Sequence, residues 1–376
     1  MGTGSVKNTV KRLLSPFPFL YSHASRSYKR LKSTGEALRW RVAVLRSRFS
    51  PLPPPATADN SNSCVAVPDP QKPEVKIITT LEELDAQLGS AELPLILDGE
   101  PNFDKPVSQL VTVAQICSAR FEQWRRLFQW GFGLNRKLWE YLYILNGCDS
   151  YGGLGAGRRA LGFGVGHERL AALLANMGCQ VMATDYVPGD GQSLGWEARS
   201  LEDLMDELVC PEEKFRQNVS FRHVDMNEIP SDLLSGQFDF LWSCGSLEHI
   251  GGLQNGLDFI EKAMACLRPG GVAVHTTEFN VVSNERTLDT PGLSFYRRQD
   301  IQGLAQRLRE QGHHIALNFT KGTTVADLHV DQEPYHYPLS INALVGEFVI
   351  TSIGLIIQKG WGGACGSASN VRAGWR

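Results

Sequence analysis

A glycine-rich turn is the strongest chemical signal in the sequence. Residues 161–168 place glycines at 162, 164 and 166, after an apolar run and before an amphipathic stretch. Glycines let the backbone approach a ligand closely, and the start of a helix offers it free N–H groups. The spacing is GxGxG, and His167 stands where a dinucleotide-binding GxGxxG pattern has its third glycine, which argues against a dehydrogenase. The residues expected to hold a cofactor here are Gly162, Phe163, Gly164 and Gly166.

Further polar positions suit the binding of a nucleoside. Asp185 ends a second apolar run, where its carboxylate can accept hydrogen bonds from both hydroxyls of a ribose, and Tyr186 follows it. Asp225 and Met226 follow a third run, and the Asp225 carboxylate suits the amino group of an adenine. A turn or a helix cap is the alternative role for Asp225. Ser243, in the fourth run, completes the predicted cofactor contacts.

A Glu-His pair follows the fourth apolar run and could carry out catalysis. A histidine can titrate near neutral pH, so His249 could remove a proton from an acceptor hydroxyl. The alternative is an orienting or purely structural histidine. The catalytic residues that we expect are His249 and Glu248.

Contacts to an acceptor are expected from a fifth apolar run and from the loops beyond it. Aromatic faces beside carboxylates suit the C–H faces and the hydroxyls of a sugar. A solvated loop with packed tyrosines would have the same composition, so this alternative stays open. The predicted substrate-binding residues are His275, Glu278, Asn280, Arg297 and Tyr335.

These residues require a layered α/β domain to position them. From residue 158 onward, short β-type runs alternate with amphipathic helical stretches. The expected strands are 160–165, 180–184, 220–224, 238–243, 272–276, 314–319 and 348–358, and the expected helices are 168–177, 253–267 and 299–311. This alternation implies a mostly parallel sheet covered on both faces, with the ligand at the carboxyl ends of the strands.

Five motifs in this order resemble the class I S-adenosylmethionine-dependent methyltransferases over residues 158–360. They are the glycine turn, Asp185, Asp225, the segment ending in residues 247–250, and the Leu-Arg-Pro-Gly-Gly turn at 267–271. The resemblance implies a Rossmann-like sheet of seven mostly parallel strands. It also implies S-adenosyl-L-methionine as the cofactor and methyl transfer as the reaction.

A looser resemblance concerns the acceptor. Segments 275–280, 296–298 and 352–356 resemble uncharacterised methyltransferases found alongside enzymes of polysaccharide biosynthesis, which implies O-methylation of a sugar or glycan precursor. The alternatives are another small-molecule acceptor and a catalytically silent cofactor-binding module. Ala160 favours the silent module, because most family members have an acid at this position; Glu168 or the preceding helical segment can substitute for it.

A metal site is a weaker interpretation of the same residues. Glu248, His249, His275 and Glu278 could together ligate a divalent ion, and the Glu-His pair resembles that of metal-dependent small-RNA 3′-terminal methyltransferases. Those enzymes have a further glutamate where this chain has Gly245. We therefore expect hydrogen-bonded groups here and no metal.

The charge of the chain is unevenly distributed. Its 376 residues carry a net charge of -3, but residues 1–50 hold eleven Lys or Arg and one acid, which gives +10 there and -13 elsewhere. Nucleic acid is not expected as a partner, because an acidic body repels phosphates. The basic arm is a solvated tail or a contact to an anionic membrane or a protein.

Composition also suggests how the chain divides. The predicted parts are a largely disordered, basic and proline-rich arm (1–75), a helical cap (76–157), a methyltransferase domain (158–360) and a tail (361–376). No apolar run approaches the roughly 20 residues that span a bilayer. Eight scattered cysteines fit a reduced cytoplasmic compartment.

Overall fold

The computed structural model describes residues 95–129, 135–187, 195–335 and 339–361. Apart from residues 195 and 196, which are assigned to a second unit, the described residues belong to one compact unit. The fold described here is that of this unit. The predicted basic arm, and all but the first residue of the predicted tail, lie outside the described residues.

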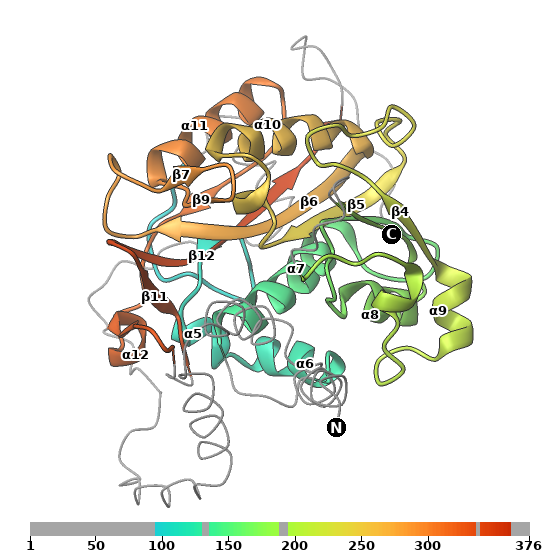
Figure 1. Cartoon of the computed structure of the whole chain (residues 1–376), viewed down its shortest axis with the longest axis horizontal. Coiled ribbons are helices and arrows are strands. Elements are labelled where there is room, and N and C mark those ends of the chain that lie inside the picture. Colours follow the sequence, from blue (N-terminus) through green and yellow to red (C-terminus); the bar gives the residue numbers. More distant parts are fainter. Residues whose placement is uncertain (1–94, 130–134, 188–194, 336–338, 362–376) are drawn as a thin grey trace, which may run out of the picture. The chain divides into compact units, whose positions relative to one another are not determined.

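Five parallel strands form the centre of the sheet, in the order β4-β3-β2-β5-β6 (Figure 1). They are β2 (Arg159–Phe163), β3 (Gln180–Asp185), β4 (Val219–His223), β5 (Phe238–Cys244) and β6 (Leu267–Asn280). The first five predicted strands are therefore confirmed. The strand order reverses between β2 and β5, which is the switch point where such sheets bind ligands.

Strand β6 begins earlier than expected, because the predicted turn at 267–271 also pairs with β5. Leu267 lies opposite Phe238, and the register then shifts before Val272 pairs with Phe240. Gly270, with a φ of 74°, makes the local bend that a Pro-Gly-Gly sequence predicts.

The other edge of the sheet is more elaborate than expected. Strand β12 (Phe348–Gln358) has the predicted bounds and runs antiparallel to β6. The predicted sixth strand is reduced to β9 (Leu317–Asn318), and β1 (Ser108–Leu110) pairs with both β9 and β12. With β10 (Val330–Asp331) and β11 (Asn342–Val345), the sheet has ten strands among the described residues, where the sequence predicted seven.

Helices cover both faces of the sheet, as predicted for a Rossmann-like fold. Helices α10 (Leu253–Ala263) and α11 (Arg298–Glu310) lie on one face. Helices α7 (Arg136–Gly152), α8 (Leu170–Asn176) and α9 (Glu212–Asn218) lie on the other (Figure 1). The remaining short elements are α5 (Val113–Ile116), α6 (Ala119–Leu127), α12 (Val325–Leu328), β7 (Asp289–Thr290), β8 (Leu293–Ser294), and the 3-10 helices η1 (Leu201–Leu204), η2 (Leu247–His249) and η3 (Met264–Cys266).

Helix α7 belongs to the segment predicted to be a cap, but it packs directly on the sheet against β5, β6 and β12. Two glycines make this close approach possible. A Cβ added to Gly354 would lie 2.1 Å from the Tyr143 ring, and one added to Gly147 would lie 3.1 Å from Ile356. The boundary predicted at residue 158 stays a prediction, and α7 forms part of the α/β core.

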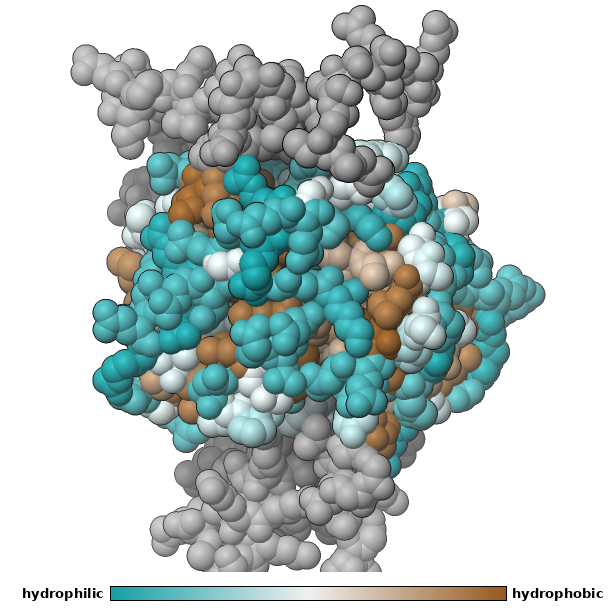
Figure 2. Space-filling view, turned by 90° about the horizontal axis from the view of Figure 1, so that it is seen from above, coloured by the Kyte–Doolittle hydropathy of each residue, from teal (hydrophilic) through white to brown (hydrophobic). Residues whose placement is uncertain are grey.

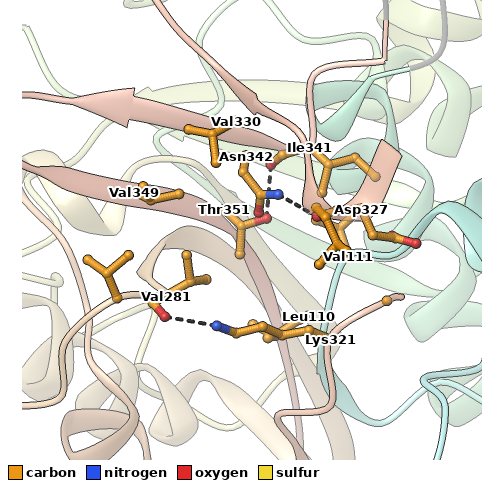
Figure 3. Close-up of a pocket in the computed structure, with 13 residues that line it drawn as sticks. Leu110, Val111, Val281, Lys321, Asp327, Val330, Ile341, Asn342, Val349 and Thr351 are labelled. Atoms are coloured by element: carbon orange, nitrogen blue, oxygen red, sulfur yellow. Dashed lines mark hydrogen bonds between the residues drawn. The ribbon is translucent and has the colours of Figure 1, made fainter. Parts of the chain in front are cut away.

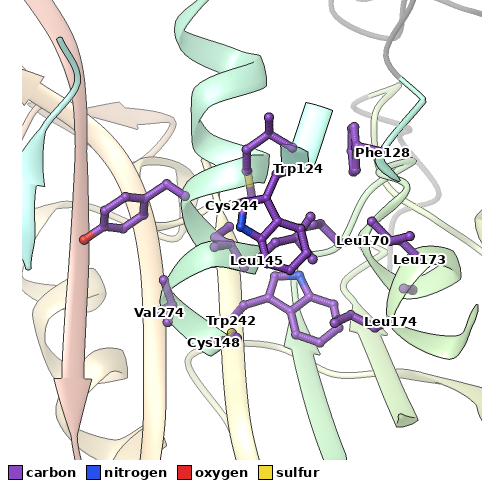
Figure 4. Close-up of a cluster of buried hydrophobic side chains, with 14 of the residues drawn as sticks. Trp124, Phe128, Leu145, Cys148, Leu170, Leu173, Leu174, Trp242, Cys244 and Val274 are labelled. Atoms are coloured by element: carbon purple, nitrogen blue, oxygen red, sulfur yellow. The ribbon is translucent and has the colours of Figure 1, made fainter. Parts of the chain in front are cut away.

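A large apolar cluster joins α6, α7 and α8 to the sheet. Figure 4 shows Trp124 and Leu145 from the helices beside Trp242 and Val274 from the strands. On the face seen in Figure 2, hydrophobic residues form separate small patches among hydrophilic ones. Within the part of the chain that the structure describes, no helix has both the length and the apolar character to cross a bilayer.

Candidate functional site

The glycine turn begins where β2 ends, at the switch point. Gly164 and Gly166 have φ values of 58° and 53°, in the left-handed region that favours glycine. A Cβ on Gly164 would lie 2.6 Å from Ser246 Oγ, which donates a 3.0 Å hydrogen bond to the Gly164 carbonyl. Larger side chains are therefore excluded at 164, where the turn meets the loop after β5.

Two predicted cofactor residues of the same turn have structural roles. A Cβ on Gly162 would lie 2.4 Å from the Trp242 ring, so this glycine permits packing inside the core. The Phe163 side chain is fully buried and contacts Phe259 edge-on, with ring centroids 5.0 Å apart. Only the backbone of these two residues is available to a cofactor.

Asp185 connects the end of β3 to the glycine turn. Its Oδ2 accepts N–H bonds from Gly166 at 2.9 Å and Ala198 at 2.7 Å, and its Oδ1 accepts one from Tyr186 at 2.8 Å. Asp185 is 7% exposed, and burial raises its pKa although the three N–H bonds oppose that shift. The Tyr186 side chain is 47% exposed beside it.

The end of β4 brings two more predicted residues to this edge of the sheet. Asp225 Oδ1 accepts a 2.8 Å hydrogen bond from the backbone N–H of Asn227, the turn role that was its alternative. Met226 is buried, and its sulfur would lie 3.4 Å from a Cβ on Gly164. Asp225 and Met226 therefore lie on the same side of the sheet as the glycine turn.

Glu168 lies between the glycine turn and α8, two residues before the helix begins. Its carboxyl group is buried and accepts a 2.6 Å hydrogen bond from Trp242 Nε1. Burial raises the pKa of Glu168 to about 8, against the influence of Trp242 and Lys137. With this pKa, Glu168 is mostly neutral at pH 7, and its carboxyl group lies against Trp242.

The expected catalytic pair lies in η2, just after β5. His249 is exposed, and its Nδ1 lies 2.8 Å from the Gly292 carbonyl oxygen. That contact requires a proton on Nδ1, so in a neutral ring Nε2 carries the lone pair. Glu248 is buried and accepts a 2.8 Å hydrogen bond from Thr277 Oγ1.

A partly buried network of charges beside η2 was not predicted. Arg136 of α7 donates to both oxygens of Glu278, at 2.7 and 2.8 Å. Lys137 donates to Glu140 Oε2 at 2.8 Å, and Ser352 donates to Glu140 Oε1 at 2.5 Å. We call Arg136, Lys137, Glu140, Glu248 and Glu278 the charge network.

The charge network holds groups of unusual acidity. Burial, helped by the charges of Glu248 and Glu140, raises the pKa of Glu278 to about 7 against the opposing charge of Arg136. At Glu140 burial acts in the same direction, but the positive charges of Lys137 and Arg136 outweigh it and lower the pKa. The signal in the sequence was the cluster of Arg136, Lys137 and Glu140 at the start of α7, because the residues that follow are mainly apolar and aromatic.

Two further predicted residues lie inside the core. His275 is fully buried, and its Nδ1 lies 2.8 Å from the hydroxyl of Ser243, which is also fully buried. Burial lowers the pKa of His275 to about 3, so this histidine is neutral. Neither side chain can contact a ligand in this arrangement.

Three other predicted acceptor residues have structural partners. Asn280 Oδ1 accepts from the backbone N–H of Val282 at 3.0 Å and so holds the loop after β6. Arg297 pairs with Asp300 at 2.9 Å at the start of α11. The Tyr335 hydroxyl donates to the Leu344 carbonyl at 2.8 Å.

No group of three or more His, Cys, Asp and Glu side chains suited to a metal ion is present in the described ranges. The four residues weighed as metal ligands have separate partners. His249 contacts Gly292, Glu248 accepts from Thr277, His275 contacts Ser243, and Glu278 pairs with Arg136.

Comparison with known proteins identifies one domain. Residues 161–275 match the model of a methyltransferase domain. No curated protein matched the chain. The matched domain and the strand order define the class I methyltransferase fold that the sequence predicted. The predicted cofactor, S-adenosyl-L-methionine, agrees with this domain.

Similar solved structures include three methyltransferases at low identity. Phosphoethanolamine N-methyltransferase 2 of Haemonchus contortus, in complex with S-adenosyl-L-methionine, is 19% identical over 52% of this chain and 42% of its own, with a TM-score of 0.31. Magnesium protoporphyrin IX methyltransferase of Synechocystis PCC 6803, with bound S-adenosylhomocysteine, is 14% identical over 65% and 97%, with a TM-score of 0.34. The 1,6-didemethyltoxoflavin-N1-methyltransferase of Burkholderia thailandensis is 15% identical over 55% and 72%, with a TM-score of 0.34. The chain spans less than half the length of the Haemonchus enzyme, and the fold is assigned from the matched domain and the strand order.

Proposed function

We propose that this chain transfers the methyl group of S-adenosyl-L-methionine to a hydroxyl oxygen of a sugar or glycan precursor. The observation that carries the methyl-transfer proposal is the 2.9 Å hydrogen bond from the Gly166 N–H to Asp185. It fixes the glycine turn against the carboxylate at the ends of two central strands, inside the matched domain. A turn and a carboxylate in this arrangement suit a nucleoside.

The cofactor would be held at this edge of the sheet. Gly164 and Gly166 supply a backbone that a ligand can approach closely, Asp185 accepts from ribose hydroxyls, and Tyr186 offers an exposed ring. Asp225 and Met226 would contact the adenine at the same edge, and the position of β4 beside β3 supports this. When bound, S-adenosyl-L-methionine supplies a methyl group that its positively charged sulfur has already activated.

Glu168 would replace the carboxylate that most family members have at position 160, where this chain has alanine. The amino end of the cofactor would lie near the carboxyl group of Glu168, which a 2.6 Å hydrogen bond from Trp242 holds in place. With its pKa raised to about 8 by burial, Glu168 is protonated in the free protein at neutral pH. A nearby ammonium group would favour the ionised form, so cofactor binding would release a proton from this residue.

His249 is the proposed general base. The Gly292 carbonyl holds the ring through Nδ1, which orients Nε2 as the acceptor of a proton. The exposed ring can then pass that proton to solvent. Glu248, fixed by Thr277, lies in the same 3-10 helix and connects the base to the charge network.

The charge network would form the polar wall of the acceptor site. Arg136 and Glu278 lie at the carboxyl end of β6, and both are partly exposed, at 15% and 17% of their side chains. Guanidinium and carboxylate groups are the donors and acceptors that recognise sugar hydroxyls. The resemblance of segment 275–280 to methyltransferases of polysaccharide biosynthesis supports a sugar. Asn280, Arg297 and Tyr335 remain proposed contacts.

A silent cofactor-binding module is the second candidate, and two observations favour it. Ala160 removes one carboxylate from the cofactor site, and the Asp185 oxygens already accept three backbone bonds. Another small-molecule acceptor is the alternative if the chain is active on something other than a sugar.

Two measurements test the proposal in sequence. Calorimetric titration with S-adenosylmethionine, S-adenosylhomocysteine and NAD should show binding of the first two alone. Labelled methyl transfer into an extract fractionated by polarity should then place the label in carbohydrate. Labelled methyl in another fraction would mean that the acceptor is not a carbohydrate. Cofactor binding without any methyl transfer would support the silent module.

The general base is tested by His249→Ala. This change should greatly reduce transfer while S-adenosylhomocysteine affinity stays nearly intact. The matched control is His329→Ala, an exposed histidine outside the proposed site that follows α12. Equal activity of the two variants would assign the base to another residue.

A further inference from the structure

A cavity of about 190 Å³ lies at the outer edge of the sheet. It is bounded by β1, β12, β11 and the loops that follow β6 and β9, and it is partly open to solvent (Figure 3). None of its lining residues belongs to the glycine turn, to the Asp185 region or to the charge network. The cavity is therefore separate from the residues proposed to contact the cofactor and the acceptor, none of which lines it.

The wall of the cavity is mainly aliphatic. Its apolar residues include Leu110, Val281, Val330, Ile341 and Val349. At the rim, Val282 is 55% exposed and Leu328 is 66% exposed, so an apolar chain can reach the interior from solvent. An apolar cavity of about 150 Å³ holds a benzene, so this one holds about six to eight carbon atoms.

One positive group lines the cavity. Lys321 Nζ donates a 2.8 Å hydrogen bond to the Val281 carbonyl, which leaves two of its three N–H groups for a ligand. Within the described ranges Lys321 has no ion-pair partner. Burial lowers the pKa of Lys321, as expected for an ammonium beside an apolar wall.

The other polar groups of the wall are already satisfied. Asp327, on the opposite side from the ammonium in Figure 3, accepts from the Val113 N–H and from Thr324 Oγ1, both at 2.7 Å. Thr351 Oγ1 donates to the backbone carbonyl of Ile341 at 2.9 Å. Asn342 Nδ2 donates to the backbone carbonyl of Asp327 at 2.6 Å. The ammonium is the group that would select the head of a ligand.

We propose that this cavity binds the aliphatic chain of a medium-length carboxylic acid, whose carboxylate pairs with the Lys321 ammonium. The apolar wall excludes water from the chain, and the charge-assisted hydrogen bond fixes the head at one end. The site needs neither S-adenosylmethionine nor an active transferase, so it can be tested independently.

Calorimetric titration of the intact chain with sodium octanoate is the test. Octanoate should bind saturably at one site, octanol should bind more weakly because it lacks the charge, and acetate should not bind because it lacks the chain. Absence of octanoate binding would overturn the proposal. Octanol binding as tightly as octanoate would overturn the carboxylate assignment.

Two variants locate the site. Lys321→Met keeps most of the aliphatic stem and should weaken octanoate binding by about ten-fold, the value of one charge-assisted hydrogen bond. Val349→Phe places a ring in the cavity and should abolish binding. An unchanged affinity in Val349→Phe would mean that octanoate binds elsewhere.

Lys359→Met is the matched control. Lys359 Nζ also donates to a backbone carbonyl, that of Leu267 at 2.7 Å, and burial lowers its pKa too, but it does not line the cavity. Its loss should leave octanoate affinity unchanged. Equal effects of the two lysine variants would contradict a specific pairing with Lys321. Circular dichroism of each variant shows whether a loss of octanoate binding comes from a folding defect. Titration of each variant with S-adenosylhomocysteine tests the cofactor proposal separately from this site.

Discussion

Asp185 has two roles at one carboxylate. A carboxylate offers about four acceptor positions. The N–H groups of Gly166, Tyr186 and Ala198 take three of them. One position is then left, so contact to both ribose hydroxyls requires a shared oxygen or the exchange of a backbone bond. This residue therefore links cofactor affinity to the shape of the glycine turn.

Replacing Asp185 with Asn should weaken S-adenosylhomocysteine binding by about 1–3 kcal/mol, because charge-assisted hydrogen bonds are lost. Calorimetry measures this change. The matched control is Asp239→Asn at the other end of the strands, where Asp239 Oδ2 also accepts a backbone N–H bond, from Arg159 at 2.8 Å. The control should lose stability but keep its affinity, and equal affinities for the two variants would remove Asp185 from the site.

The contribution of Glu168 to the stability of the folded protein should decrease as pH rises. Burial raises its folded pKa from 4.5 to about 8, so the folded state keeps a proton that the unfolded chain has lost. The stabilising contribution is complete below pH 4.5 and is lost as pH rises to about 8. Glu168→Gln stays neutral and can still accept from Trp242.

Thermal unfolding at several pH values tests this prediction. The melting temperature of the wild-type chain should fall relative to that of Glu168→Gln between pH 5 and 8. A difference that stays constant over this range would show that Glu168 does not keep its proton.

Site residues whose signal lies in the neighbouring sequence could be predicted, and contacts between residues far apart in the sequence could not. The glycines and Asp185 carry their signal in the adjacent strand and turn. Arg136 and Glu278 are 142 positions apart, and nothing near either residue indicates the other. His275 was expected near the end of the strand predicted over 272–276, but β6 continues to Asn280 and His275 lies within it. The alternation of side chains along β6 turns His275 into the core, while Glu278 meets α7.

At the scale of elements, the contact between α7 and β12 is the feature that the sequence did not indicate. The sequence predicted a helical segment over residues 76–157, but not which surface α7 covers. Strand β1 has three residues, and its partner in β12 lies more than 200 positions away, so its short sequence carried no usable signal. The longer, strongly apolar strands were predictable because burial on both faces requires near-continuous apolar runs.

Gly354→Ala tests the packing of α7. The added methyl group would lie 2.1 Å from the Tyr143 ring, and such overpacking should lower the free energy of unfolding by about 1–3 kcal/mol. Gly303→Ala is the control, because this glycine lies within α11 and an added Cβ meets only Arg307, at 3.6 Å. It should raise stability by up to about 1 kcal/mol. Denaturant unfolding measures both, and equal stabilities would contradict the close contact.

At the scale of the whole molecule, charge is the clearest property of the sequence. The chain combines a +10 segment over residues 1–50 with a -13 remainder. The predicted roles of that segment, and the cytoplasmic location, stay predictions. Nucleic acid as the acceptor stays disfavoured by the acidic remainder.

The basic segment should bind anionic vesicles if it contacts a membrane. The full chain should sediment with phosphatidylserine vesicles at low salt and be released at about 0.5 M salt, where screening is strong. A variant with Gln at the basic positions between 29 and 48 should remain in solution. Equal sedimentation of both chains, or binding to neutral vesicles, would assign the segment another role.

The most direct measurement is a crystal structure of the chain with S-adenosylhomocysteine. We predict the nucleoside against Gly164 and Gly166, with its ribose on the Asp185 carboxylate and its amino end above Glu168. Electron density for the ligand at any other place would contradict the proposed methyltransferase site. The absence of ligand density at the glycine turn and Asp185, at a saturating ligand concentration, would contradict it too.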